Sequence, residues 1–137
     1  RYLTERGVLN VSAENLLLYT AKGAGTRIKA LIPLDENFAR LCGYYLAEGC
    51  ITQDTGRASA VRDRVLFSFH AEEAEYIADV RNLLEMLGMK WISSTSTNAT
   101  TTIVSSRIFA YLLRDVLGCG VRSDDKCLPK FAFESAE

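Results

Sequence analysis

The sequence lacks the positive charge that marks a non-specific nucleic-acid binder. Its formal net charge is −1 over 137 residues, whereas such binders are usually basic. Binding to nucleic acid would therefore require the basic side chains to gather on one face. With 48% hydrophobic and 24% charged residues, the composition predicts a folded chain with one core of ordinary size.

Long apolar runs and zinc-type cysteine spacings are missing as well. No run approaches the roughly 20 residues that span a bilayer, so we expect no membrane partner and an intracellular, cytoplasmic location. No signal peptide is visible, although the chain begins at Arg1 without a methionine, as a fragment or a processed piece would. The four cysteines, which we expect to be buried reduced thiols, lack the short spacing of a zinc knuckle. They are Cys42, Cys50, Cys119 and Cys127.

The clearest predicted element is a helix that begins after Asp35 and ends at Gly49. Asp35 is typical of an N-cap residue, and an acid follows it in the first turn. One face of this helix carries bulky apolar residues at core-facing spacing. They are Phe38, Leu41, Cys42, Tyr45 and Leu46. A second face carries only Ala39, Gly43 and Ala47, so another backbone can approach it closely.

Downstream, the hydrophobic period alternates between that of strands and that of helices. The expected strands are 50–53, 64–70, 90–94 and 100–105. The expected helices are 72–87 and 106–117, the latter with Phe109, Leu112, Leu113 and Val116 inward. The order α-ββ-α-ββ-α predicts an α+β fold, with a four-stranded antiparallel sheet and helices on one face. The other face of the sheet is then polar and exposed.

The first 32 residues form an arm of uncertain structure, and residues 33–137 form the domain. Within the arm, residues 7–11 fit a short strand. Ser12 fits either the cap of a brief helix to Leu18 or a turn before a strand over 16–20.

The stretch 41–49, LCGYYLAEG, resembles the LAGLIDADG motif position by position. Glu48 falls on the final acidic position, and Leu46 replaces the first Asp. The outright matches are Leu41, Gly43, Ala47 and Gly49, and the departures at loose positions are Cys42, Tyr44 and Tyr45. Phe67-Ser68-Phe69 and Lys126-Cys127-Leu128-Pro129 are similar to later segments of the family. The resemblance covers about residues 33–137 and is closest in appearance to endonuclease domains embedded in inteins.

This resemblance implies a LAGLIDADG-type αββαββα unit that acts as a site-specific double-strand DNA endonuclease. Glu48 would bind Mg²⁺ (or Mn²⁺), with the carbonyl oxygen of Ala47 as a second hard ligand. Lys126 would polarise the scissile phosphate or position the attacking water. Gln53 would orient a water.

The family also implies that two motif helices pack together through the small face of Ala39, Gly43 and Ala47. Because only one motif copy is present, the unit must form a homodimer or be half of a two-repeat protein. The exposed sheet face would lie in the major groove of double-stranded DNA. The candidate DNA-binding residues are Gln53, Arg57, Arg62, Arg64, Ser68, His70 and Lys90, with Ser94, Thr100 and Thr102 as lesser candidates.

Two other functions fit the same residues. One is a catalytically inactive nucleic-acid-binding relative, such as a splicing maturase or a transcription factor. The other is a degenerate intein insert that has lost its homing function. In either case Glu48 would be an ordinary helix-end carboxylate, Lys126 a solvated loop lysine and His70 a polar residue at a strand end.

Overall fold

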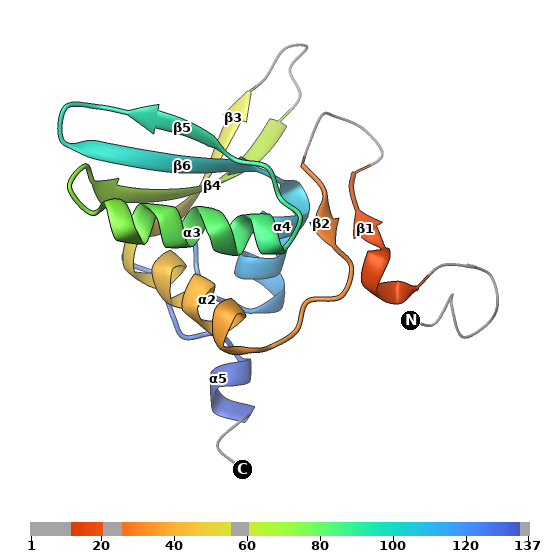
Figure 1. The fold of residues 1–137 in the computed structure, drawn as a ribbon. Helices are drawn as coiled ribbons and strands as arrows, with labels where there is room; N and C mark the ends of the chain where they lie inside the picture. Colours follow the sequence, from red (N-terminus) through yellow and green to blue (C-terminus); the bar gives the residue numbers. More distant parts are fainter. Residues whose placement is uncertain (1–11, 21–25, 56–60, 135–137) are drawn as a thin grey trace.

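A four-stranded antiparallel sheet with helices packed on one face forms the body of the protein (Figure 1). The structure is a computed structural model and describes residues 12–20, 26–55 and 61–134. The strand order is β3-β4-β6-β5, with bounds β3 Gly49–Thr55, β4 Val61–His70, β5 Ile92–Thr95 and β6 Ala99–Ser105. The helices are α2 Glu36–Glu48, α3 Ala74–Met86, α4 Arg107–Tyr111 and α5 Phe131–Glu134. The predicted α+β fold and its α-ββ-α-ββ-α order are confirmed.

Helix α2 begins and ends where the sequence predicts. The Asp35 carboxylate accepts a hydrogen bond from the Phe38 amide at 2.9 Å, which satisfies one of the unpaired N–H groups of the first turn. Phe38, Leu41 and Tyr45 are buried on the inner face. Gly49 follows directly in extended conformation, and a Cβ there would collide with the Tyr45 ring. A glycine is therefore required at this position by space, not by a left-handed backbone.

The first two strands extend further than predicted. β3 continues to Thr55 and β4 begins at Val61, because the paired register runs on through Gln53↔Asp63 to Thr55↔Val61. The buried Asp63 interrupts the apolar alternation from which the start of β4 was predicted. By contrast, α3 begins later than predicted, at Ala74 rather than residue 72. The Glu73 carboxylate accepts the His70 amide at 2.8 Å in a turn that precedes the helix.

The last helix of the domain changes its pitch. Ser106 caps α4 by accepting the Phe109 amide at 3.1 Å, but α4 passes into a π-helical turn, η3 (Leu112–Val116). In this wider turn the Leu117 amide donates to the Leu112 carbonyl at 2.8 Å. The extra residue rotates the following side chains, so Leu117 is buried and Val116 is 47% exposed. The prediction that Val116 points inward is therefore wrong.

Part of the N-terminal arm packs on the domain. A 3-10 turn, η1 (Ala13–Asn15), precedes β1 (Leu17–Leu18), which pairs with β2 (Ile28–Lys29). The turn-then-strand alternative is thus the one observed, with a shorter strand, and residues 7–11 lie outside the described residues. Ile28 is 1% exposed and belongs to the core, while the Lys29 amide donates to the Leu87 carbonyl at 2.9 Å. In the described part of the chain, no helix is both long and apolar enough to cross a bilayer.

The cysteines are all free thiols, but they differ in environment. Cys42 and Cys119 are buried, and burial raises the pKa of Cys42 to about 12 and that of Cys119 to about 11. Cys50 is half-buried and Cys127 is exposed. The expectation of burial is therefore wrong for Cys127, which lies on a surface loop.

Candidate active site

Glu48 is the last residue of α2, and β3 begins at the next residue. Its side chain is exposed, at the end of the helix where the backbone carbonyls carry partial negative charge. A carboxylate is unfavourable there unless a cation offsets the charge. Among the residues that the structure describes, no group of three or more His, Cys, Asp or Glu side chains could hold a metal ion. At this end of α2 the described residues offer the Glu48 carboxylate and nearby backbone carbonyls.

Lys126 lies at the same end of α2. Its amine donates to the Leu46 carbonyl at 3.1 Å and sits 5.2 Å from the centre of the Tyr45 ring. Burial lowers the pKa of Lys126, and the neighbouring Cys50 and Glu48 act in the opposite direction. The structure thus brings together the two residues that the resemblance assigned to metal binding and to the phosphate.

Tyr45 of α2 anchors the loop that carries Lys126. The Tyr45 hydroxyl donates to the Gly120 carbonyl at 2.6 Å, and its fully buried ring packs edge-on against Phe67. Burial raises the pKa of Tyr45, so the phenol stays protonated and keeps its donor. The Ile51 amide of β3 also donates to the Val121 carbonyl at 3.1 Å. Two strong contacts therefore tie this loop to the motif helix and to the strand that follows it.

Asp125 holds the loop together from within. One carboxylate oxygen accepts the amides of Val121 and Arg122 at 2.8 and 2.7 Å, and these two bonds lower the pKa of Asp125. Gly120 has φ +81°, and a Cβ there would collide with the Asp125 carbonyl. Sequence analysis missed the positioning roles of Tyr45 and Asp125. The available signal was an aspartate directly before Lys126 in a loop that starts with glycine.

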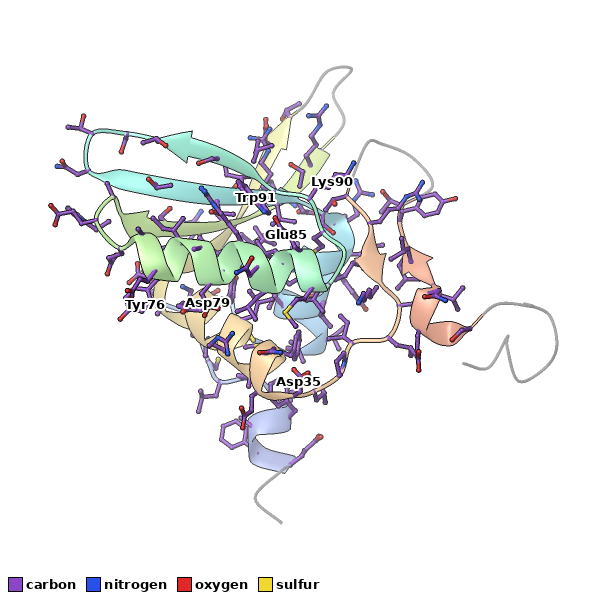
Figure 2. The ribbon with its side chains drawn as sticks, in the orientation of Figure 1. Asp35, Tyr76, Asp79, Glu85, Lys90 and Trp91 are labelled. Carbon is purple, nitrogen blue, oxygen red and sulfur yellow. The ribbon has the colours of Figure 1, made fainter. Side chains whose placement is uncertain are left out.

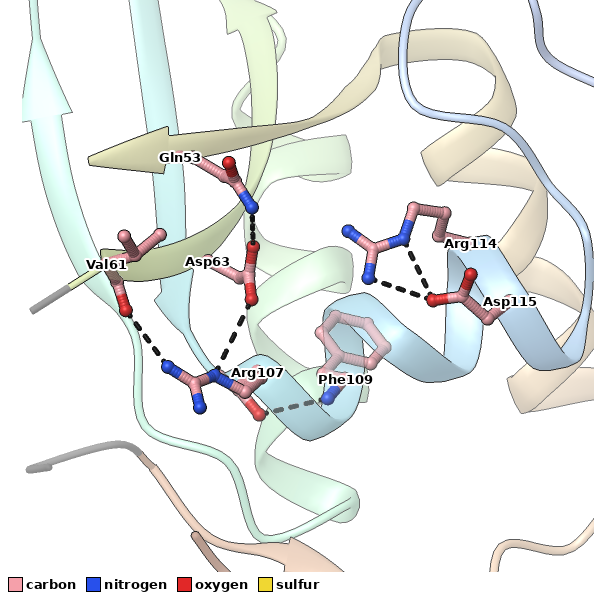
Figure 3. Close-up of polar contacts among 8 residues, drawn as sticks. Gln53, Val61, Asp63, Arg107, Phe109, Arg114 and Asp115 are labelled. Atoms are coloured by element: carbon pink, nitrogen blue, oxygen red, sulfur yellow. Dashed lines mark hydrogen bonds and ion pairs between the residues drawn. The ribbon is translucent and has the colours of Figure 1, made fainter. Parts of the chain in front are cut away.

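Gln53 is not brought into this group. Its side chain lies on the helix side of the sheet, where its amide donates to the buried Asp63 carboxylate at 3.0 Å (Figure 3). Arg107 approaches the other oxygen of Asp63 at 3.8 Å and donates to the Val61 carbonyl at 3.1 Å. Along an extended strand, five residues separate Gln53 from Glu48 by roughly 16 Å. The expectation that Gln53 orients a water near Glu48, or contacts bases on the open face, does not agree with this placement.

Four predicted DNA-contacting residues do share the open face of the sheet. Arg62, Arg64, Ser68 and His70 alternate along β4 with residues whose side chains are buried beneath it. Arg64 is held by Asp54 of β3 at 2.7 Å, and its buried Nε has no hydrogen-bond partner among the described residues.

The lesser candidates are divided between the two faces. Thr102 is 1% exposed and accepts a hydrogen bond from Arg81 of α3 at 3.1 Å, so it faces the helices, and Thr100 lies on the same side by alternation. Ser94 pairs with Thr101 on the open side. Lys90 precedes β5, and its amide donates to the Thr26 hydroxyl at 2.8 Å. Arg57 lies outside the described residues.

Trp91 is a packing residue between the sheet and α3. Arg81 stacks over its ring at 4.2 Å, and the indole N–H donates to Glu85 at 3.1 Å. These contacts join the edge of the sheet at β5 to helix α3 (Figure 2).

The small face of α2 is open among the residues that the structure describes. Ala39, Gly43 and Ala47 are exposed, and a Cβ added at Gly43 would meet nothing within 4 Å. Beside this face, Arg40 forms two hydrogen bonds with Asp79 of α3, at 2.7 and 3.0 Å. These bonds hold α2 against α3.

Comparison with known proteins gives matches to parts of much longer chains. No protein-family model matches the sequence. An uncharacterized protein of Methanocaldococcus jannaschii is 42% identical over 120 residues, which are 88% of this chain and 13% of that protein. An iron-sulfur cluster assembly SufBD family protein of Mycobacterium tuberculosis is 37% identical over 98 residues, 67% of this chain and 10% of that protein. A DNA polymerase of Thermococcus aggregans is 26% identical over 113 residues, 82% of this chain and 6% of that protein.

Two of the similar solved structures are proteins bound to DNA. I-DmoI with DNA and Mn is 17% identical with a TM-score of 0.48, and the alignment covers 59% of this chain and 49% of that chain. The LAGLIDADG meganuclease I-AabMI bound to uncleaved DNA is 13% identical with a TM-score of 0.45, over 61% of this chain and 28% of that chain. These likenesses are partial.

Proposed function

We propose that this chain is a LAGLIDADG-type endonuclease unit that hydrolyses phosphodiester bonds of double-stranded DNA at a specific site. The observation that carries the proposal is the meeting of Glu48 and Lys126 at the end of a helix whose small-residue face is exposed. An ordinary helix-end carboxylate would need neither the half-buried lysine nor the exposed small-residue face beside it.

The pattern of matches supports an inserted domain. Overlapping segments of 98 to 120 residues match three proteins and span 6% to 13% of their length. Two of these proteins have names that describe different activities, an iron-sulfur cluster assembly protein and a DNA polymerase. A self-contained unit placed inside unrelated hosts would produce this pattern. We propose an intein-type endonuclease insert.

The donor chemistry at Glu48 fits a hard divalent cation, Mg²⁺ or Mn²⁺. A carboxylate and the neighbouring Ala47 carbonyl are the oxygen ligands that such ions prefer. When bound, the ion would supply Lewis-acid stabilisation and lower the pKa of a water molecule. Lys126 would place its amine beside the scissile phosphate, where a point positive charge stabilises the charge that develops on the oxygens. The Tyr45 and Asp125 contacts would keep that amine in place.

A complete site requires a second motif helix, because one chain supplies one such carboxylate. We propose that the face of Ala39, Gly43 and Ala47 packs against the same face of a second copy or of a second repeat. Small residues allow the two helix ends, and so the two carboxylates, to lie close together. Each would then serve one strand of the duplex.

Glu48→Gln tests the proposal, with Glu36→Gln on the first turn of the same helix as the control. A target is first selected from a randomised duplex library by binding in Ca²⁺, and cleavage is then followed in Mg²⁺ or Mn²⁺. We expect Glu48→Gln to bind but not cut, and Glu36→Gln to bind and cut. If the wild type binds DNA and never cuts in either metal, the chain is an inactive nucleic-acid-binding relative. If it binds no DNA at all, the chain is a degenerate insert.

A further inference from the structure

An apolar row crosses the open face of the sheet from edge to edge. The register pairs Cys50 with Leu66, Leu66 with Ile103, and Ile103 with Ile92, so one residue from each strand stands in the row. Ile92 is 59% exposed and the other three are half-buried. A half-buried cysteine thiol behaves as a small hydrophobic group. We propose that this row recognises thymine methyl groups in the DNA target, an inference that rests on the proposed function.

The rows on either side are polar. On one side, Thr52 and Arg64 are cross-strand partners and Arg64 pairs with Ser105. On the other side, the hydroxyls of Ser68 and Thr101 bond each other at 2.8 Å. Groups that donate or accept strong hydrogen bonds thus flank a strip that has no strong donor or acceptor. A sheet face that contacts only water would be polar throughout and would lack such a strip. A face that packs on another apolar surface would lack the flanking arginine and serine.

The dimensions of the row match the major groove. Three interstrand spacings make the row about 14 Å long, and the groove is about 12 Å wide. When the strands run along the groove, the row spans its width. Leu66 and Ile103, on the two central strands, then face the base edges, while the residues at the ends lie near the sugar-phosphate walls.

In the major groove, the base edges present one apolar group that the row could contact, the thymine methyl. Guanine, cytosine and adenine present donors and acceptors in the major groove, and thymine adds the C5-methyl group. An aliphatic side chain against a donor or acceptor would leave that group without water or a partner, which costs affinity. Against a thymine methyl, the same side chain gains from burial. The row therefore selects A·T pairs at the positions that it covers.

The position of the apolar row along the strands places the contacted A·T pairs near the cleavage position. Cys50 follows Glu48 by two residues, or roughly 7 Å of extended chain, which is about two base-pair steps. The two polar rows lie two residues along the strands from the apolar row, one on each side of it. Contact with thymine is thus expected at one or two positions of each half-site, between positions contacted by polar side chains.

The test replaces each thymine of the selected target by deoxyuridine, which removes the methyl and keeps every donor and acceptor. For the wild-type protein in Ca²⁺, we expect affinity to fall on the order of fourfold for each contacted methyl at one or two positions per half-site. Leu66→Ala should abolish the sensitivity at one of these positions. Ser68→Ala, on the adjacent row of the same strand, should retain it.

The outcomes separate the two proposals. If the wild type binds its target and every thymine tolerates deoxyuridine, the methyl-recognition inference is overturned and the endonuclease proposal is unaffected. If sensitivity persists unchanged in Leu66→Ala and also in Ile103→Ala, the row does not cause it and the inference again fails. If no DNA is bound at all, both the proposed function and the methyl-recognition inference are overturned. Because the deoxyuridine series uses the wild-type protein, its result does not depend on how well a variant folds.

Discussion

Replacing Tyr45 by phenylalanine removes one oxygen atom from the centre of the candidate site. The ring stays, with its packing on Phe67 and its contact with Lys126, and the bond to the Gly120 carbonyl at 2.6 Å is lost. A hydrogen bond contributes about 0.5–1.5 kcal/mol net, and leaving the half-buried Gly120 carbonyl unpaired adds to the loss. We therefore expect the free energy of unfolding to fall by about 1–2 kcal/mol. For a chain of this size that corresponds to a fall in Tm of roughly 4–8 °C.

The same substitution tests the positioning role of Tyr45. Without its tether, the loop from Cys119 to Lys126 is held by fewer bonds, and a shift of about 1 Å in a catalytic group can cost on the order of 100-fold in rate. We expect kcat for cleavage to fall by about tenfold or more, while target affinity in Ca²⁺ stays unchanged. Calorimetry gives the stability and single-turnover cleavage gives the rate.

Tyr44→Phe is the matched control, since it removes a hydroxyl from the neighbouring residue of the same helix. That hydroxyl donates to Asp79 at 2.8 Å, but Asp79 keeps two bonds to Arg40, so less is lost. Tyr44→Phe should leave kcat unchanged. The reasoning is refuted if Tyr45→Phe is as stable as the wild type, or if both variants lose cleavage to the same extent.

Two other substitutions probe the surfaces of α2. Arg40, and after it the Tyr44 hydroxyl, lower the pKa of Asp79 below its ordinary value near 3.8, against the opposing effect of burial; a lowered folded-state pKa stabilises the protein above the unfolded-state value. Asp79→Asn should therefore be less stable than the wild type in urea at pH 7, with the difference shrinking as the pH falls below 4. Gly43→Ala should raise the stability of the dilute single chain by about 1 kcal/mol, because alanine favours helix and the added Cβ meets nothing. In sedimentation the same change should weaken self-association, and stronger association would contradict the proposed helix contact.

Local signals were enough to predict α2 and the order of the elements. The Asp35 cap, the apolar stripe and the final glycine all act within a few residues, so the helix bounds could be predicted closely. The alternation in β4 likewise identified the open face that bears Arg64 and Ser68. By contrast, no local signal marks the π turn after α4, and the extra residue in that turn moved Val116 outward.

The candidate site depends on contacts between distant residues. The partners Tyr45 and Gly120 are 75 positions apart, and a sequence cannot show that a motif tyrosine will meet that carbonyl. For Gln53 a signal existed and was missed, because alternation from the apolar Ile51 places both side chains on the helix side. The apolar row was missed for a different reason. Leu66 lies between Arg64 and Ser68 on the same face, but a lone apolar residue between polar ones carries no sequence signal for a base contact.

The direct passage of α2 into β3 has a mechanical consequence. Glu48 and Gly49 are adjacent, with no loop between helix and strand, and Gly49 is paired with Phe67 in the sheet. A surface that contacts bases and a carboxylate that holds the metal would then be parts of one rigid body. Substitutions on the sheet could change which sequence is bound, but the distance from that sequence to the broken bond would stay the same. The backbone would fix the spacing between the recognised bases and the cleavage position. Only an insertion or deletion near residue 49 would change that spacing.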